Sequence, residues 1–170
     1  MGEGSLGGKA RGLAFLNNIV QKYELSTRYP GLRITIPRTV VVATDYFDRF
    51  IVENGLQYVI DANISDEELL SEFVSSRLPE ELVEQLKVYI ETVSSPLAVR
   101  SSSKLEDSHY QPFAGIYSTY MIPCVENKDQ MLRLLGKAIK SVYASVYFAA
   151  SRAYLHTTGN LLSEEKMAVV

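Results

Sequence analysis

Residues 97–107 read Leu-Ala-Val-Arg-Ser-Ser-Ser-Lys-Leu-Glu-Asp, and this stretch decides how the rest of the chain is interpreted. Its apolar start, residues 97–99, predicts a short strand. An arginine at the end of an apolar strand is held rigidly, and its guanidinium can form two parallel hydrogen bonds to a phosphate. Arg100 is therefore a candidate phosphate ligand, and Ser101 and Ser102 can add hydroxyl and backbone donors. The alternative is a polar turn with a surface ion pair, worth only about 0–1 kcal/mol.

A glycine-rich segment at the N-terminus is the second candidate site. Residues 2–7 satisfy the pattern G-x-G-x-x-G, but no strand precedes them, as a dinucleotide site requires. A phosphate-binding P-loop is excluded because Glu3 and Ala10 occupy two of its fixed positions. Residues 7–9, Gly-Gly-Lys, open a predicted helix, whose free N–H groups and positive end favour an anion. On local sequence alone, a turn with a solvated Lys9 is the commoner outcome.

The hydrophobic pattern predicts an α+β fold with a helical middle segment at about residues 44–93. Ser65 with Glu68 forms a capping box, Thr44 and Asn127 are predicted to cap further helices, and Gly159 is predicted to end the last one. A β-branched run entered through Pro37 predicts a strand. A loop is expected at 101–112 because that stretch is polar. The expected helices lie at 6–25, 45–53, 65–75, 79–93 and 127–156, and the expected strands at 34–42, 97–100, 116–122 and 166–170.

Composition excludes several classes of protein. The chain has 170 residues, of which 46% are hydrophobic and 22% are charged, as in a folded globular domain. Its net charge of −3 argues against a basic nucleic-acid binder, and a single cysteine, Cys124, excludes an internal disulfide. Without a secretory signal or a long apolar run, we expect a cytoplasmic protein with no membrane partner. Glu106 and Asp107 are weak metal candidates, and neither His109 nor His156 lies in a ligand-spaced cluster.

The order of these motifs resembles a known family. Gly-Gly-Lys at 7–9, Ile-Pro at 36–37, Val-Arg-Ser-Ser at 99–102 and Phe-Ala-Gly at 113–115 follow one another as in the N-terminal ATP-binding domain of phosphoenolpyruvate synthase and pyruvate phosphate dikinase. The resemblance spans essentially the whole chain. It implies an ATP-grasp fold, with a mixed sheet, in which two α+β parts close on the nucleotide.

The resemblance also implies a set of ATP-binding residues. Lys9 and Arg100 match family positions that contact phosphate, and Gly115 and Thr119 match positions that line the same site. Together with Ser101 they form the expected cofactor-binding set, and no catalytic or metal-binding residue is expected within the chain. The family's Mg²⁺ carboxylates would lie beyond Val170, so residues 1–170 would be the first portion of the domain, truncated at its C-terminus.

In the full enzymes of this family, ATP phosphorylates a histidine on a swivelling domain, which carries the phosphoryl group to a domain that binds pyruvate and phosphoenolpyruvate. The resemblance therefore implies the ATP-binding part of a phosphotransferase, inactive by itself. Two alternatives stay open: a non-catalytic nucleotide-sensing or interaction module that reuses this domain, and a structural α+β domain without a ligand.

Overall fold

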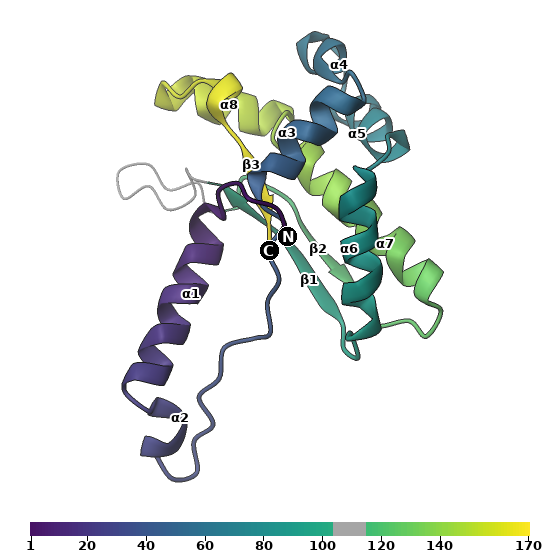
Figure 1. The fold of residues 1–170 in the computed structure, drawn as a ribbon. Coiled ribbons are helices and arrows are strands. Elements are labelled where there is room, and N and C mark those ends of the chain that lie inside the picture. The colour runs from purple at the N-terminus through teal and green to yellow at the C-terminus, as the bar shows by residue number, and fades with distance from the viewer. Residues whose placement is uncertain (104–114) are drawn as a thin grey trace.

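Strand β1 (Leu97–Ser103) forms the centre of the fold, which the computed structural model describes for residues 1–103 and 115–170. It lies between β2 (Thr119–Ile122) and β3 (Met167–Val169) in a three-stranded sheet (Figure 1). Helices pack around this sheet, which confirms the α+β class. The expectation of a mixed sheet is wrong for the described residues, because both pairings of β1 are antiparallel.

The register of β1 corrects the prediction that a loop begins at residue 101. Arg100 lies opposite Thr119 in β2, and its backbone N–H and C=O both pair with Val170 at 2.8 Å. The strand continues through 101–103, which pair with β3 and are fully buried. Polarity predicted a loop, but backbone hydrogen bonds from a strand far away in the sequence hold the serines in the sheet.

Helix α7 (Lys128–Ser145) packs on the sheet and contacts all three strands. It also packs against α5 (Asp66–Ser75) and α6 (Glu80–Glu91). Its buried side chains include those of Leu135 and Ile139, so its apolar face closes the core. Among the helices of the described ranges, none combines the length and the apolar character needed to cross a membrane.

The helical middle comprises α3 (Thr44–Glu53), α4 (Gln57–Asp61), α5 and α6 (Figure 1). Five aromatic rings join it to α7 in one buried cluster, in which neighbouring ring centroids lie 5.1–6.2 Å apart. Each such pair contributes about 0.5–1.5 kcal/mol beyond its buried area. The cluster consists of Phe47, Phe50, Phe73, Tyr143 and Tyr147.

Local capping signals are confirmed at several helix ends. Ser65 and Glu68 form the predicted capping box at the start of α5. The side chain of Asn127 accepts a hydrogen bond from Gln130 N–H at the start of α7. Gly159, with φ +69°, ends α8 (Ala149–Thr158) in the left-handed conformation that glycine favours.

The predicted helix over 127–156 is two helices, because the chain turns at 146–148. Phe148 adopts an extended conformation before α8. The carboxylate of Asp66 accepts a hydrogen bond from Ala149 N–H at 2.8 Å, and Arg152 donates to the carbonyl of Ile60. Contacts with the helical middle therefore satisfy a free backbone N–H group at the start of α8 and anchor its first turn. No local sequence signal indicated this second helix.

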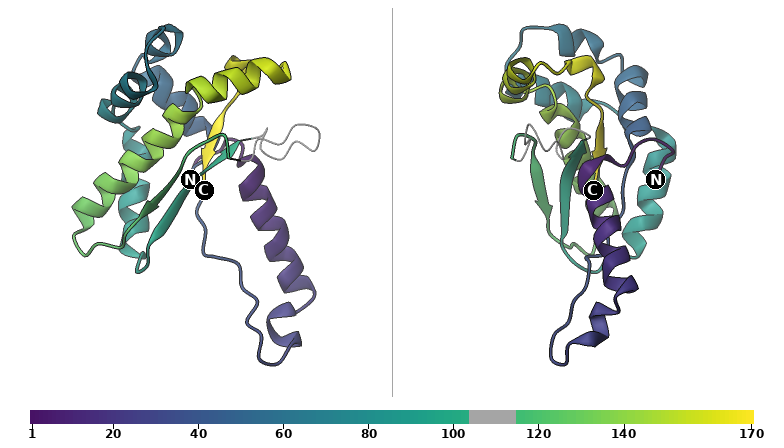
Figure 2. Two further views of the ribbon diagram at one scale, coloured as in Figure 1. Left: turned by 180° about the vertical axis from the view of Figure 1, so that it is seen from behind. Right: turned by 90° about the vertical axis from the view of Figure 1, so that its left-hand side faces the viewer.

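Residues 7–41 form an arm that starts and ends against the sheet and whose far part, around α2, extends away from the rest of the structure (Figure 2). It contains α1 (Gly7–Lys22), α2 (Leu25–Arg28) and an extended segment. The predicted strand over 34–42 is wrong except at Val42, which forms an isolated bridge with Val169. The β-branched residues before it meet no strand partner among the described residues, and β-propensity without a partner does not make a strand. The strand predicted over 116–122 is likewise confined to β2.

The hydroxyl of Tyr143 generates a stability prediction. Tyr143 is fully buried, burial raises its pKa, and no described residue lies within hydrogen-bonding distance of its hydroxyl. Because an unsatisfied buried hydroxyl costs about 1–3 kcal/mol, Tyr143→Phe is expected to raise the free energy of unfolding by up to that amount. Tyr46 is the matched control, since it is equally buried but its hydroxyl accepts from Gln85 Nε2 at 3.0 Å.

Tyr46→Phe is expected to lower stability. Chemical denaturation of both variants measures the two effects. A loss of stability in Tyr143→Phe equal to that in Tyr46→Phe would contradict the assignment of an unsatisfied group.

Candidate functional site

The N-terminus of α1 is joined to β1 by the side chain of Ser102. The Ser102 hydroxyl donates to the carbonyl of Leu6 at 2.9 Å and accepts from Ala10 N–H at 3.1 Å. Ser102 is fully buried, so both bonds are shielded from water. The first turn of α1 is thereby fixed against the strand that carries Arg100.

Gly7 makes this close approach possible. Its φ of +69° is in the left-handed region, and a Cβ at this position would lie 1.7 Å from the carbonyl oxygen of Ser102. No side chain can occupy that space. A glycine is therefore required where the chain enters α1.

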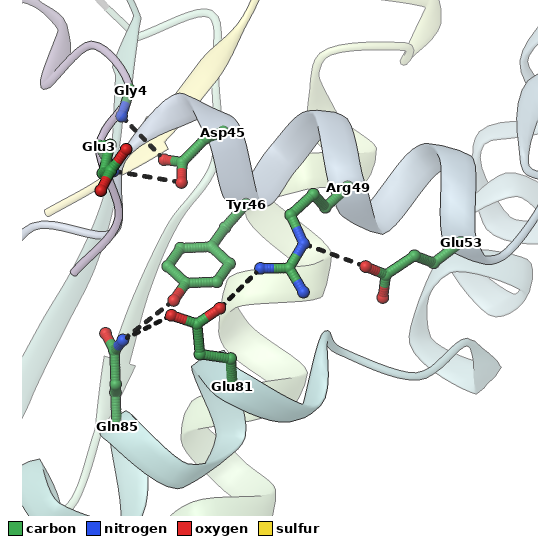
Figure 3. A network of polar contacts seen from close by, with 8 residues as sticks. All are labelled: Glu3, Gly4, Asp45, Tyr46, Arg49, Glu53, Glu81 and Gln85. Atoms are coloured by element: carbon green, nitrogen blue, oxygen red, sulfur yellow. Dashed lines mark hydrogen bonds and ion pairs between the residues drawn. The ribbon is translucent and has the colours of Figure 1, made fainter.

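The N-terminal end of α3 holds the other side of the glycine-rich segment (Figure 3). The carboxylate of Asp45 accepts hydrogen bonds from Glu3 N–H at 3.2 Å and Gly4 N–H at 3.0 Å. Thr44 Oγ1 accepts from Ser5 N–H at 2.9 Å instead of capping α3, whose N-cap is Ala43, so the predicted cap at Thr44 is wrong.

The glycines of the G-x-G-x-x-G pattern therefore serve the protein's own packing. A Cβ on Gly2 or on Gly4 would lie 2.4 Å or 2.6 Å from atoms of Asp45, and Gly7 faces Ser102. Each of the three approaches a protein group more closely than a side chain would allow.

The ionisation of Asp45 is tied to this segment. Partial burial opposes the charged form, but hydrogen bonds from the backbone of Glu3, Gly4, Asp45 and Tyr46 together outweigh it and lower the pKa of Asp45 below its usual value of 3.8. The carboxylate thus occupies donors that a bound anion would otherwise use.

Two of the predicted residues, Lys9 on α1 and Arg100 on β1, line the same cavity. Lys9 lies in the first turn of α1, and its Nζ donates to Ser101 Oγ at 3.3 Å. Arg100 is the neighbouring residue on β1, where it is exposed and lies opposite Thr119. Directly opposed residues of an antiparallel pair lie on the same face, so Arg100 and Thr119 share a face, whereas Ser101, the next residue of the strand, faces the other side. Gly115 lies before β2, and a Cβ there would face open space.

The free N–H groups expected at the start of α1 are in part already used. Gly7 N–H donates to Ser5 Oγ at 3.3 Å, and Ala10 N–H donates to Ser102. The side chains of Lys9 and Arg100 therefore carry more of any contact with an anion than the sequence alone indicated.

A cavity of about 810 Å³ opens beside these two cations. Its walls come from α1, the extended segment 37–42, α6, α7 and the sheet, and they are mainly apolar. This size and composition are typical of small-molecule sites. The lining includes Lys9, Leu13, Leu16, Pro37, Val40, Tyr89, Leu97, Arg100, Met121 and Val170.

The described residues offer no group of three or more His, Cys, Asp or Glu side chains that could hold a metal ion. Glu106, Asp107 and His109, which the sequence analysis considered as ligands, lie outside the described residues. No part of the site is therefore assigned to a metal.

Sequence reasoning missed Thr44 and Asp45, and it treated Ser102 only as a possible donor to a ligand. The pair Thr-Asp at the start of a helix does indicate side chains that accept backbone hydrogen bonds, but we expected the acceptor to serve its own helix. In the structure both side chains accept from residues 3–5 instead. For Ser102 the sequence offered no local signal: nothing near it indicates that the side chain is buried or that its partners are residues 6 and 10.

Comparison with known proteins supports a nucleotide site. The family described as the AMP/ATP-binding domain of pyruvate phosphate dikinase matches residues 3–170. The chain belongs to this family. Its match begins at the glycine-rich segment and includes both Lys9 and Arg100.

A relative in Bacillus subtilis (strain 168), the uncharacterized phosphotransferase YvkC, is 28% identical to this chain over 137 residues. The aligned region is 81% of this chain and 15% of that protein. The AMP/ATP-binding domain described here thus corresponds to a small part of the relative's length.

Gly7 can be tested against a second glycine of the same helix. Gly7→Ala is expected to destabilise the domain by about 2–5 kcal/mol, from about 1–2 for the left-handed backbone and about 1–3 for the steric overlap. Gly12, which is exposed and has no atom within 4 Å of an added Cβ, is the control. Gly12→Ala is expected to stabilise by about 0.5–1 kcal/mol. Thermal melts that rank the two variants in the opposite order would refute the close approach.

The lowered pKa of Asp45 predicts a pH dependence of stability. A depressed pKa means that Asp45 contributes stability above its usual value of 3.8 and loses it as the pH falls through the lower value of the folded state. Asp45→Asn is expected to be less stable than the parent near neutral pH, and the difference is expected to shrink as the pH falls below about 4. Denaturation curves between pH 3 and pH 7 measure this difference, and a gap that stays constant would contradict the prediction.

Proposed function

We propose that this domain binds ATP with its phosphates at Lys9 and Arg100, as the nucleotide-binding part of a phosphotransferase. The observation that carries the proposal is that these two cations, from segments far apart in the sequence, both line one large, mainly apolar cavity. Membership of an AMP/ATP-binding family supports the same assignment.

The cationic and the apolar lining residues of the cavity suit the phosphates and the base of a nucleotide. A guanidinium and an ammonium group give charge-assisted hydrogen bonds to phosphate oxygens, and Arg100 adds the geometry for two parallel bonds. Ser101 holds the Lys9 ammonium group at 3.3 Å, which orients it beside the strand. Thr119, on the same face as Arg100, can add a hydroxyl group.

The apolar part of the cavity suits a nucleobase. Pro37, Val40 and Leu97 line it, and Met121 on β2 is 71% exposed, so its thioether is free to pack on a flat ring. We assign no contact to Gly115, whose role as a lining residue stays a prediction.

We further propose that the domain is the first portion of an ATP-grasp fold, and that a second portion after Val170 covers the nucleotide. The relative is much longer than the aligned region, which supports further domains in a full-length protein. Transfer to a histidine on a swivelling domain and then to pyruvate is the reaction that the family resemblance implies. A Mg²⁺ ion would neutralise charge on the transferring phosphoryl group, and its ligands would come from residues beyond those described.

Alanine substitutions of Lys9 and Arg100 test the site. A charge-assisted hydrogen bond contributes about 1.5–3 kcal/mol, so each variant is expected to bind ATP roughly tenfold to a hundredfold more weakly. Calorimetric titration of ATP into the full-length protein and each variant measures the loss.

Two further variants serve as controls. Lys22→Ala removes a lysine from the same helix, about 20 Å away at 1.5 Å per residue, and Arg77→Ala removes an exposed arginine before α6. Both are expected to bind ATP as the parent does. Unchanged affinity in Lys9→Ala and Arg100→Ala, or an equal loss in the controls, would overturn the proposed site.

A further inference from the structure

We propose that Ser102 is a positioning residue of the phosphate site: its hydroxyl, which touches no ligand, sets the place of Lys9. This inference rests on the proposed function, because it concerns how the site for ATP is held. The proposed role of Ser102 differs from that of its neighbours: Arg100 would contact the phosphates, and Ser101 contacts Lys9 directly.

The Ser102 hydroxyl forms two hydrogen bonds to the start of α1, one as donor and one as acceptor. One hydroxyl group donates to Leu6, 96 residues away, and accepts from Ala10, 92 residues away. The two partners flank the first turn of α1, which contains Lys9. Gly7, inside the same turn, touches the backbone of Ser102 and leaves no room for a different approach.

Loss of the hydroxyl would release this turn. Ala10 is buried, so its N–H would lose the Ser102 oxygen as an acceptor in a place that water does not reach. Without these two bonds the hydroxyl would no longer hold the turn on β1, and a shift of the turn would carry the Lys9 ammonium group with it. A displacement of about 1 Å is enough to cost a well-oriented site a factor of about a hundred.

Ser151 provides the matched control. It is also fully buried, and its hydroxyl also donates to a backbone carbonyl, that of Ser145 at 2.6 Å. Both of these residues lie at the junction of α7 and α8, which does not line the 810 Å³ cavity. Ser151→Ala therefore removes a comparable buried hydrogen bond without touching the phosphate site.

The experiment compares Ser102→Ala with Ser151→Ala in the full-length protein. Titrations with ATP, with tripolyphosphate and with adenosine separate the phosphate contacts from the base contacts, and thermal melts report stability. Ser102→Ala is expected to weaken ATP and tripolyphosphate binding about tenfold or more and to leave adenosine binding within about twofold. Ser151→Ala is expected to melt at a lower temperature with unchanged binding.

Ser102→Cys keeps the size of the side chain with a weaker donor and acceptor. It is expected to lose less tripolyphosphate affinity than Ser102→Ala, and it decides the question if the alanine variant does not fold. Equal losses for adenosine and tripolyphosphate, or no selective loss in either variant, would overturn the positioning role. If Lys9→Ala and Arg100→Ala also leave ATP binding unchanged, the proposed function fails; if they weaken it, only this inference fails.

Discussion

The contact between the start of α1 and the serine run of β1 is the constraint on which the site depends. Gly7 lies against the backbone of Ser102, and the Ser102 hydroxyl bonds to both sides of the same turn. A helix and a strand cannot approach so closely unless the helix begins with glycine and the strand presents a small polar side chain. These two requirements fix where Lys9 and Arg100 lie relative to each other.

The glycine-rich segment is held from two directions, and the two attachments differ in character. Towards β1 the contact is buried, neutral and sterically tight. Towards α3 it depends on the carboxylate of Asp45, which is only partly buried and takes up backbone donors of the segment. The segment is thus a structural connector between a helix, a strand and a second helix, and its anionic partner is supplied by the protein itself.

Features decided by neighbouring residues could be predicted from the sequence, and features decided by distant ones could not. The capping box at Ser65 and the left-handed end at Gly159 depend on a few adjacent residues, and both were predicted correctly. The start of α8 accepts help from Asp66, whose carboxylate bonds to Ala149 N–H, and the extension of β1 pairs with β3. Both partners are distant in the sequence, so no local pattern predicted either feature. The same division applies to the site: local motifs made Lys9 and Arg100 candidates, whereas the hydrogen bonds of Ser102 to residues 6 and 10 could not be predicted.

The long sequence separation of these contacts has a consequence for folding. Leu6 and Ser102 are 96 residues apart, and Val42 pairs with Val169. At synthesis rates of about 5–20 residues per second, the N-terminal segment waits roughly 5–20 seconds for its partner strand, and longer for β3. Contacts between such distant residues form slowly because a large loop must close first. The first turn of α1 is therefore synthesised well before the strand that fixes it, and it reaches its final position only once β1 and β3 have formed.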